Sequence, residues 1–389
     1  MGYSSQDDLI AKVSAGAYLR RDVAKLITPV GLAGQWNCSA NLAGSPNAST
    51  YPSAADLTWV NCSEPYGEGT TILGIQHGGN PAAGLTKHIL NVGAMFVAAA
   101  GAPWQAKLVD LQGYYTLAGA TNLHGTGSRT CINSENFTCD DLGGKMRLNY
   151  TSDWQTGTKF RVVETGGLPT GLVALTDYWL TRVTATTGKV STSYENLVAG
   201  TYVNYTNTGT PTNLMRIEMP RYDQGVGCEA FFVVQAAPTA GGPTISASAY
   251  DNTTSTPGSG TRAFQGTPTF GAAAAATVPT IPHSGAAAGR YGAFLPKQGG
   301  DLGIARINSF TLSGGTAYTT GGKLALCIAR PLLDIACPVT GMWSERDLVN
   351  QLMSMPQVMN GACLVWLYFA TGGTTNNGQF NSTIDFGWA

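Results

Sequence analysis

Hydrophobic and polar residues alternate in short runs over most of the chain, from about residue 31 onward. In "MRIEM", residues 215–219, the apolar side chains share one face of an extended strand, and Arg216 and Glu218 share the other. The same alternation recurs in "ISASAY" at 245–250 and "KLALCIA" at 323–329, and clusters of Gly, Pro, Asn and Thr separate such runs. Short strands bounded by turn residues are typical of sandwiches and barrels, so the pattern predicts a mainly β protein.

The first 27 residues follow a different pattern. Their apolar residues recur at roughly helical spacing, and Asp7 and Asp8 stand where the positive end of a helix dipole favours acidic side chains. Gly16 is expected to interrupt the helix, because glycine is a weak helix former. We therefore expect an N-terminal helix over this segment.

A second helix is predicted near the C-terminus, in "MWSERDLVNQLMSMP". Ser344 is a good N-cap, and Asp347 three residues later completes a capping box. Trp343 before the cap and Leu348 within the first turn fit a hydrophobic staple, and Pro356 ends the helix. The triplet of Glu, Arg and Asp is therefore interpreted as the start of a short helix, not as a catalytic site.

Five side chains on these two helices are candidates for contact with a neighbouring subunit. Arg346 has no role in the predicted cap, and the apolar stripe of the C-terminal helix needs a surface to cover it. That surface is either internal or on a neighbour, and the sequence leaves both open. The candidate interface residues are Arg346, Leu352, Trp343, Leu9 and Val13.

The predicted elements divide the chain into a helical arm and two β-sandwich (jelly-roll-like) units. The arm covers residues 1–30, the first sandwich domain 31–185 and the second 186–389. Within the second domain, residues 251–290 are rich in Pro, Gly, Ala and Thr and nearly uncharged, which predicts a long arm held by a neighbouring subunit.

Two stretches of the chain resemble one another. Residues 146–180 and 215–250 each open with Met-Arg and an apolar residue, then give a Gly-containing turn and a Phe-x-Val-Val strand in which Phe160 matches Phe231. Either they are a repeat of one β unit, or they are a chance likeness between Thr- and Gly-rich strands. Both interpretations remain open at the level of sequence.

The low charge content of the chain indicates which classes of binding partner to expect. Only 12% of residues are Asp, Glu, Lys or Arg, against roughly 25% in ordinary globular chains, and the formal net charge is -1. Nucleic-acid binding requires a basic surface, so no nucleic-acid partner is expected. No apolar run approaches the roughly 20 residues of a membrane-spanning helix, so no membrane partner is expected either.

The N-terminal residues contain two Asp and no apolar signal-peptide core, which predicts synthesis and folding in a cytoplasm. The N-x-[ST] sequons are therefore interpreted as a by-product of composition. Eight cysteines are present and none forms a C-x-x-C pair, which argues against a zinc ribbon. They are either small buried hydrophobes or, for Cys131 with Cys139 and Cys327 with Cys337, partners in disulfides that close short loops outside the reducing cytosol.

A search for catalytic motifs yields no site. A P-loop, a dinucleotide fingerprint, H-E-x-x-H, an EF-hand loop and G-x-S-x-G are all absent from the sequence. His77, flanked by glycines, is interpreted as bonded to a loop carbonyl. For Trp154, Tyr114 and Tyr115, packing in the core or at an interface is favoured over stacking on a sugar. We therefore expect no enzyme, no catalytic residue, no metal ligand and no cofactor.

Three segments together resemble the uncharacterised virion structural proteins of tailed bacteriophages. They are "DLIAKVSAGAYLRRDVAKL" near the start, "YGEGTTILGIQHGGN" at residues 66–80, and the closing stretch from "PLLDIACPVTGMWSERDLVNQL" to "IDFGWA". The resemblance spans most of the chain and implies a repeated, non-enzymatic part of the particle, located in the virion.

Within that resemblance, we expect a capsid decoration or cement protein that bridges capsomers. Its partners would be the major capsid protein or other virion proteins, and its own copies in a homo-oligomer, a trimer in preference to other orders. The alternative is a tail, collar or fibre component that binds glycans during host recognition. A virion-borne depolymerase ranks last, because no pair of acids in a groove can be assembled from the sequence.

Overall fold

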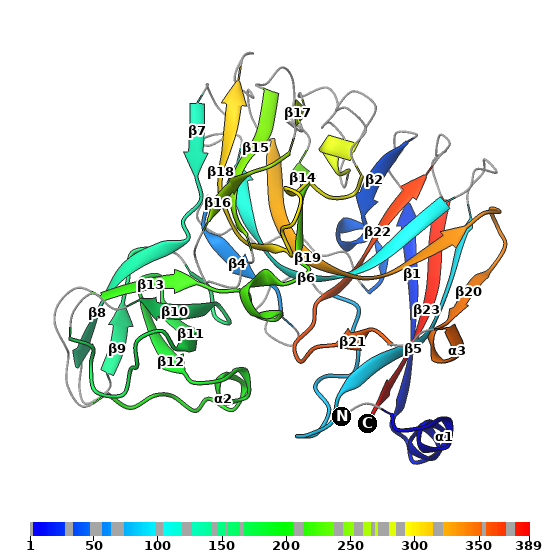
Figure 1. The fold of residues 1–389 in the computed structure, drawn as a ribbon, viewed down its shortest axis with the longest axis horizontal. Coiled ribbons are helices and arrows are strands. Elements are labelled where there is room, and N and C mark those ends of the chain that lie inside the picture. The colour runs from blue at the N-terminus through cyan, green and yellow to red at the C-terminus, as the bar shows by residue number, and fades with distance from the viewer. Residues whose placement is uncertain are drawn as a thin grey trace.

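The computed structural model describes most of the chain, in eighteen ranges. They are residues 3–27, 34–46, 57–63, 74–97, 104–118, 127–141, 146–152, 154–163, 167–205, 213–236, 244–252, 260–265, 269–270, 280–284, 292–313, 322–351, 355–370 and 378–389. These ranges are mainly β, as the alternation predicted, and antiparallel pairing joins the strands of every sheet. Figure 1 shows a barrel at one side, an upright sandwich above it and a two-sheet body at the other side.

The body consists of two sheets. The first has the order β20-β5-β23-β1-β3, with β21 also paired to β5, and the second has the order β14-β19-β6-β22-β2, with β4 also paired to β6. The bounds of the first are Ser344–Asp347 (β20), Lys87–Val97 (β5), Gly378–Trp388 (β23), Tyr18–Ile27 (β1), Gly44–Ser45 (β3) and Gln357–Val358 (β21). Those of the second are Glu229–Ala236 (β14), Lys323–Cys337 (β19), Trp104–Ala118 (β6), Leu364–Ala370 (β22), Gln35–Cys38 (β2) and Trp59–Asn61 (β4).

Eight of these strands have the connectivity of a single jelly roll. In chain order they are β1, β2, β5, β6, β19, β20, β22 and β23, and the first, eighth, third and sixth lie side by side in one sheet. The second, seventh, fourth and fifth lie side by side in the other, which is the double Greek-key order of a jelly roll. An apolar core between the sheets includes Phe96, Trp104, Trp366 and Phe380.

In the described residues, the strands outside these two sheets all lie in sequence between β6 and β19, the fourth and fifth strands of the jelly roll. A closed barrel has the order β10-β11-β12-β9-β8-β13, and a third sheet has the order β16-β15-β18-β7 with β17 paired to β15. The barrel strands are Lys159–Val163 (β10), Asp177–Thr184 (β11), Thr187–Ser191 (β12), Met146–Asn149 (β9), Ser134–Asp141 (β8) and Asn213–Ile217 (β13). The third sheet comprises Thr261–Ala263 (β16), Thr244–Asn252 (β15), Ile304–Ser313 (β18), Gly127–Thr130 (β7) and Thr269–Phe270 (β17).

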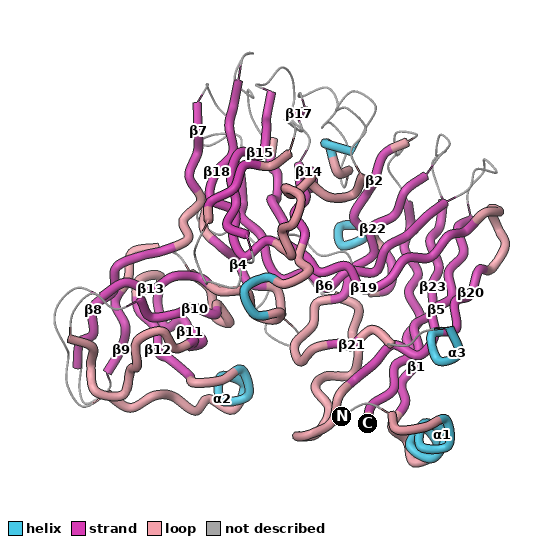
Figure 2. Tube along the Cα trace, in the orientation of Figure 1, coloured by secondary structure: helices cyan, strands magenta, loops and turns pink. Residues whose placement is uncertain are grey.

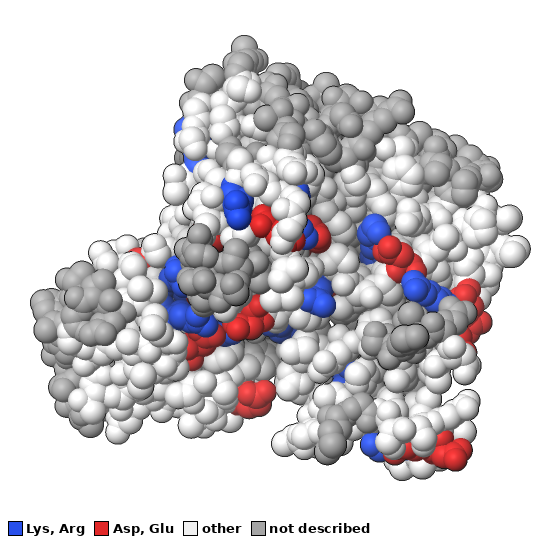
Figure 3. All heavy atoms as spheres, viewed as in Figure 1, with Lys and Arg blue, Asp and Glu red and all other residues white. Residues whose placement is uncertain are grey.

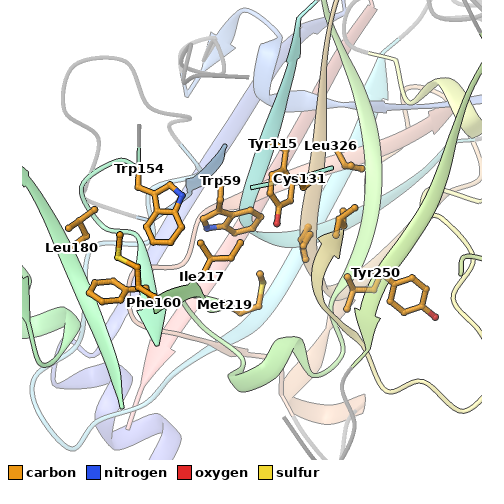
Figure 4. Close-up of a cluster of buried hydrophobic side chains, with 14 of the residues drawn as sticks. Trp59, Tyr115, Cys131, Trp154, Phe160, Leu180, Ile217, Met219, Tyr250 and Leu326 are labelled. Carbon is orange, nitrogen blue, oxygen red and sulfur yellow. The ribbon is translucent and has the colours of Figure 1, made fainter. Parts of the chain in front are cut away.

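The long strands β6 and β19 belong to both the jelly roll and the upright sandwich (Figure 2). They pair from Lys323 opposite Ala118 to Cys337 opposite Trp104. Residues 323–329 of β19 pair with β14, and residues 113–115 of β6 pair with β4. These parts of the two strands pack against the third sheet, through an apolar core that continues into the barrel (Figure 4). Trp59, Trp154 and Phe160 are fully buried in this shared core.

The structure corrects the predicted domain division. The boundary at 185 and 186 falls between β11 and β12, which pair as a hairpin of the barrel. Strands of the predicted first and second domains also pair with one another, as β6 does with β19. A boundary read along the chain cannot follow a fold in which one unit is inserted between two neighbouring strands of another.

The N-terminal helical arm is correct only in its first half. The helix α1 spans Gln6–Ser14, with Ser5 as its N-cap, and Gly16 follows at φ +90°, a conformation that glycine adopts without strain. From Tyr18 the chain is the strand β1, which pairs along its whole length with β23. The segment after Gly16 is thus part of the jelly roll, because sheet pairing outweighs a weak helical pattern.

The C-terminal helix also begins later than predicted. Ser344–Asp347 form β20, paired to β5, and the helix α3 spans only Leu348–Gln351. Asp347 is its cap, since one carboxylate oxygen accepts from the backbone N–H of Val349 at 2.9 Å and of Asn350 at 3.4 Å. Ser344 is not the cap, because the edge of β5 offers its backbone a sheet partner instead.

The two similar stretches are not copies of one unit. The matched strands that contain Phe160 and Phe231 are β10 in the barrel and β14 in the second sheet. In addition, β10 pairs directly with β13, the strand that a repeat would equate with β9. The likeness is therefore of composition and not of structure.

Part of the Pro/Gly/Ala-rich segment 251–290 lies in the described residues. It begins within β15, then forms β16 and β17, which both pair with β15, and a 3-10 turn, η3, at Pro282–Ser284. His283 of that turn is fully buried and its ring lies 6.3 Å from that of Phe232. The described parts of this segment are therefore packed within this chain, mainly in the third sheet; its other residues lie outside the described ranges.

Candidate functional site

The structure gathers exposed apolar side chains at one corner of the jelly roll. Val97 at the end of β5 is 41% exposed, and Val339, Met342 and Trp343, in the turn between β19 and β20, are 52%, 54% and 40% exposed. The turn is held against β5, because the N–H of Gly341 donates to the carbonyl of Phe96 at 2.7 Å. We call these four side chains the β5–β20 corner.

Gly93 positions the tryptophan of this corner. The Trp343 ring lies across the β5 backbone so closely that a Cβ on Gly93 would stand 2.4 Å from the ring. Only glycine leaves room for this contact, since real Cβ contacts essentially never fall below 3.0 Å. The ring is therefore held in one place and still presents a large apolar surface outward.

The corner continues into β20, the outermost strand of the first sheet. Arg346 of this strand is turned inward, where its guanidinium donates to the carbonyl of Asp334 at 2.7 Å. Glu345 accepts from the side-chain amide of Asn91 at 2.5 Å. Of the predicted interface residues on this segment, Trp343 thus lies at the surface and Arg346 has an internal partner, whereas Leu352 lies outside the described residues.

The two predicted interface residues on α1 serve mainly to dock that helix. Leu9 is buried and Val13 is half-buried, whereas Ile10, which the sequence analysis did not single out, is 57% exposed. Periodicity identified the correct helix, but the exposed position is one residue away from the predicted one. α1 lies far from the β5–β20 corner in Figure 1, at the opposite end of β5 and β1.

Neither predicted disulfide is formed. All eight cysteines are free and buried. Cys327 and Cys337 both belong to β19, so that ten residues of extended strand, roughly 33 Å, separate them and a bond between them is impossible. Cys131 and Cys139 are likewise separate buried side chains in the shared core. The interpretation as small buried hydrophobes describes these four residues.

The side chains that the sequence offered as possible binding residues have structural roles instead. The His77 ring lies 3.1 Å from the carbonyl of Ala362 through Nε2 and 3.2 Å from the Lys87 ammonium through Nδ1. Trp154, Tyr114 and Tyr115 are fully buried. Loop bonding and packing, the interpretations that the sequence favoured, are therefore correct for them.

A cleft lies between the barrel and the jelly roll. Its volume is about 320 Å³, with Trp179 and Tyr194 on the barrel side and Thr86, Gln357 and Asn360 on the jelly-roll side. Tyr194 opens the short helix α2 (Tyr194–Val198), which Ser193 caps by accepting from the N–H of Asn196 at 3.1 Å. Gly361, at φ +69°, lets the Tyr194 ring approach the backbone, since a Cβ there would stand 2.9 Å from the ring.

The two walls of the cleft also touch through polar groups. The Asn360 amide donates to the Glu195 carboxylate at 3.4 Å across the opening. The Lys159 ammonium lies 5.4 Å from the centre of the Trp179 ring and pairs with Asp177 at 2.9 Å. Half-exposed aromatic rings beside amides, hydroxyls and one carboxylate can stack on a sugar ring and bond its hydroxyls. The residues named on the two walls are about 90 residues or more apart in the chain, so no local sequence pattern indicates this cleft.

Charged side chains cluster in the middle of the face drawn in Figure 3, and others lie along α1 and near β20. Arg161 of the barrel pairs with Asp177 at 2.6 Å, and Arg306 of the third sheet pairs with Glu218 at 3.3 Å and with Asp251 at 3.1 Å. The Asp177 hydrogen bond raises the pKa of Arg161 above its usual range. These charges are used within the chain and leave large areas of surface uncharged.

No protein-family model, no curated protein and no solved structure matches this chain. None of the helices in the described ranges is both long and apolar enough to cross a membrane. Within the same ranges, no three side chains of His, Cys, Asp or Glu are placed to share a metal ion. Any function must therefore be argued from the β5–β20 corner, the cleft and the fold themselves.

Proposed function

We propose that this chain is a bacteriophage virion structural protein, a capsid decoration or cement protein that bridges neighbouring capsomers. The observation that carries the proposal is the β5–β20 corner on a jelly-roll body. Jelly rolls occur in capsid proteins, lectin domains and cupins, so the fold alone is compatible with the proposal but does not select it. The resemblance of three sequence segments to phage virion proteins points the same way.

The proposed mechanism is burial of uncharged surface between subunits. Trp343 is held by Gly93 and loses little freedom when a partner covers it, which favours binding by an aromatic anchor. The adjacent strand β20 is only four residues long, so a partner would be recognised mainly by side chains and not by extension of the sheet. The expected partners are the major capsid protein and further copies of this chain, with a trimer as the favoured oligomer.

The test compares two double variants of similar chemistry. Met342→Ser with Trp343→Ser removes the corner, whereas Val226→Ser with Leu302→Ser removes two exposed apolar side chains elsewhere. We expect the corner variant to bind at least about tenfold more weakly to heads stripped of the protein, in co-sedimentation, and the control variant to bind as the parent does. Circular dichroism checks that both are folded, and light scattering gives the oligomer.

Equal binding by the two variants would contradict the corner as the contact surface. A particle reconstruction separates the wider alternatives. Density for this chain over the outer face of the head supports a decoration role. Chains that close into shells without another protein would instead make it a shell subunit, and density only in the tail would overturn the head assignment.

A second candidate, a glycan-binding tail or fibre component, is favoured by the cleft. Tyr194 and Trp179 supply stacking surface and the Glu195–Asn360 pair supplies hydrogen bonds. Neutral hexose oligosaccharides are the probe, in calorimetric titrations with Tyr194→Ala and, as control, Tyr202→Ala, an exposed tyrosine elsewhere on the barrel. If the cleft binds sugars, only Tyr194→Ala weakens binding, by about tenfold. Absence of binding by the parent chain would dismiss this candidate.

A further inference from the structure

Two cysteines from distant parts of the chain meet at a break in a strand. Strands β4 and β22 lie end to end along the same edge of β6, both antiparallel to it: Asn61 is opposite Gly113 and Leu364 is opposite Asp110. The residues at the break continue both ladders. Cys62 donates its N–H to the carbonyl of Gln112 at 2.9 Å, and Cys363 accepts from the N–H of Leu111 at 2.8 Å.

A bulge in β6 turns both thiols to one face. Gln112 is the extra residue between Leu111 and Gly113, which pair with consecutive residues of β19. As a result, Leu111 and Tyr114 both contribute to the same apolar cluster, although strict alternation would place them on opposite faces. Cys62 and Cys363 are members of that cluster too. Burial and, after it, the neighbouring Cys363 thiol raise the pKa of the Cys62 thiol.

No other cysteine in the described residues is so placed. Cys327 belongs to the same cluster but lies on β19, on the other side of β6, opposite Tyr114. Two strand spacings, roughly 9.5 Å, separate its ladder position from the row that contains Cys62, beyond the reach of a disulfide. Cys38 is opposite Leu367, further along β22. The pair of Cys62 and Cys363 is therefore the one that the sheet geometry supports.

We propose that Cys62 and Cys363 are a preorganised dithiol that forms a disulfide under oxidising conditions and so closes the break between β4 and β22. The two thiols lose two protons and two electrons to a low-molecular-weight disulfide such as oxidised glutathione. One sulfur first forms a mixed disulfide and releases one glutathione thiol; the second sulfur then attacks it and releases the other. The inference stands independently of the function proposed above.

The bond would join covalently two parts of the jelly roll, β4 and β22, that each pair with β6. Cys62 follows the strand β4, and Cys363 directly precedes β22, so the bond closes a loop of some 300 residues. Because the stabilisation from a disulfide grows with the loop that it closes, the effect on the unfolded chain is large. Burial raises the pKa of the Cys62 thiol well above its usual range, so exchange in the folded protein is slow.

The experiment avoids that slow step by producing the full chain in a host with an oxidising cytoplasm. Peptide mapping without reductant is expected to find Cys62 linked to Cys363, and thiol titration to find six free thiols of the eight present. The melting temperature should exceed that of the reduced protein by about 5 °C and fall back after treatment with dithiothreitol. Cys327→Ser is expected to keep the link, and Cys62→Ser or Cys363→Ser to abolish it.

Three results would overturn the proposal. They are eight free thiols in protein made under these conditions, a link that involves any other cysteine in place of this pair, and a Cys62–Cys363 link that leaves the melting temperature unchanged or lowers it. Urea-unfolded protein exposed to oxidised glutathione serves as the control that all eight thiols can react. Because Cys62→Ser and Cys363→Ser change only one atom, a folding defect in either is detected separately by circular dichroism.

Discussion

At the scale of single residues, the surroundings of a buried polar side chain can differ greatly from those that its sequence neighbours suggest. His283 lies in a segment of low complexity, yet its ring is fully buried in the turn η3 beside Phe232. Burial lowers the pKa of His283 to about 3, from an ordinary value of 6.5. The folded chain therefore holds this imidazole in its neutral form throughout the mildly acidic range.

This burial makes stability fall in mild acid. Below pH 6.5 the unfolded chain takes up a proton at His283 that the folded chain takes up only near pH 3, so each unit of pH in between costs about 1.4 kcal/mol. Between pH 6.5 and 5 we expect a loss of about 2 kcal/mol in the free energy of unfolding, measured by urea denaturation. His283→Gln should flatten this dependence. An equally steep decline in the variant would show that other groups cause it.

The identity of single residues also explains why the strand β1 was predicted to be helical. On β1 the inward positions are Leu19, Arg21, Val23, Lys25 and Ile27. Lys25 is buried, and its ammonium donates to the carbonyl of Leu42 at 3.1 Å, so a cation occupies a core position. Two cations among five inward residues hide the two-residue period, and the remaining apolar positions suggest a helix. No local pattern reveals the carbonyls that satisfy Lys25.

At the scale of elements, the start of α3 depends on the side chain that caps it. Asp347→Ala removes the acceptor of two backbone N–H groups and should lower the free energy of unfolding by about 1 kcal/mol. Ser344→Ala, the matched control at the position that the sequence favoured as cap, should cost less than about 0.5 kcal/mol. Equal losses from both substitutions, in the same denaturation assay, would place the cap at neither residue.

Elements with strict alternation were predictable, and their arrangement was not. β13 overlaps "MRIEM" and buries every second residue, Asn213, Met215 and Ile217, and β15 contains "ISASAY". Such alternation is a property that five or six residues carry by themselves. The walls of the cleft are about 90 to 180 residues apart in the chain, and Cys62 and Cys363 are about 300 residues apart. A single sequence contains no local signal for such pairing, so these features became visible only in three dimensions.

At the scale of the whole molecule, one buried ion pair joins the barrel to the jelly roll. Arg221, just after the last barrel strand, pairs with Asp110 of β6 at 2.7 Å and is 6% exposed. Its guanidinium also donates to the carbonyls of Leu111 and Gly361 and to the hydroxyl of Ser63. Although burial acts to lower the pKa of Arg221, Asp110 raises it above its usual range. The segment that leaves the barrel is thus fixed to the centre of the body.

Loss of this pair should weaken the link between the units. Arg221→Met leaves the Asp110 carboxylate buried without its cation, and we expect a loss of about 3–5 kcal/mol in the free energy of unfolding. We expect calorimetry to resolve two transitions for the variant and one for the parent chain. Arg20→Met, which removes an exposed cation beside Asp22, is the control and should change stability by less than about 0.5 kcal/mol. An unchanged single transition in the Arg221 variant would contradict this role.

The shared strands β6 and β19 also have a consequence for the order in which the chain folds. They pair over their whole length, yet residues 119–322 separate them in sequence. Closing so large a loop is entropically costly, and ribosomal synthesis delivers β19 only after the barrel and the third sheet have emerged. The central ladder of the molecule must therefore be completed late, around units that are already compact. We infer slow refolding from denaturant, with barrel signals that recover before those of the jelly roll.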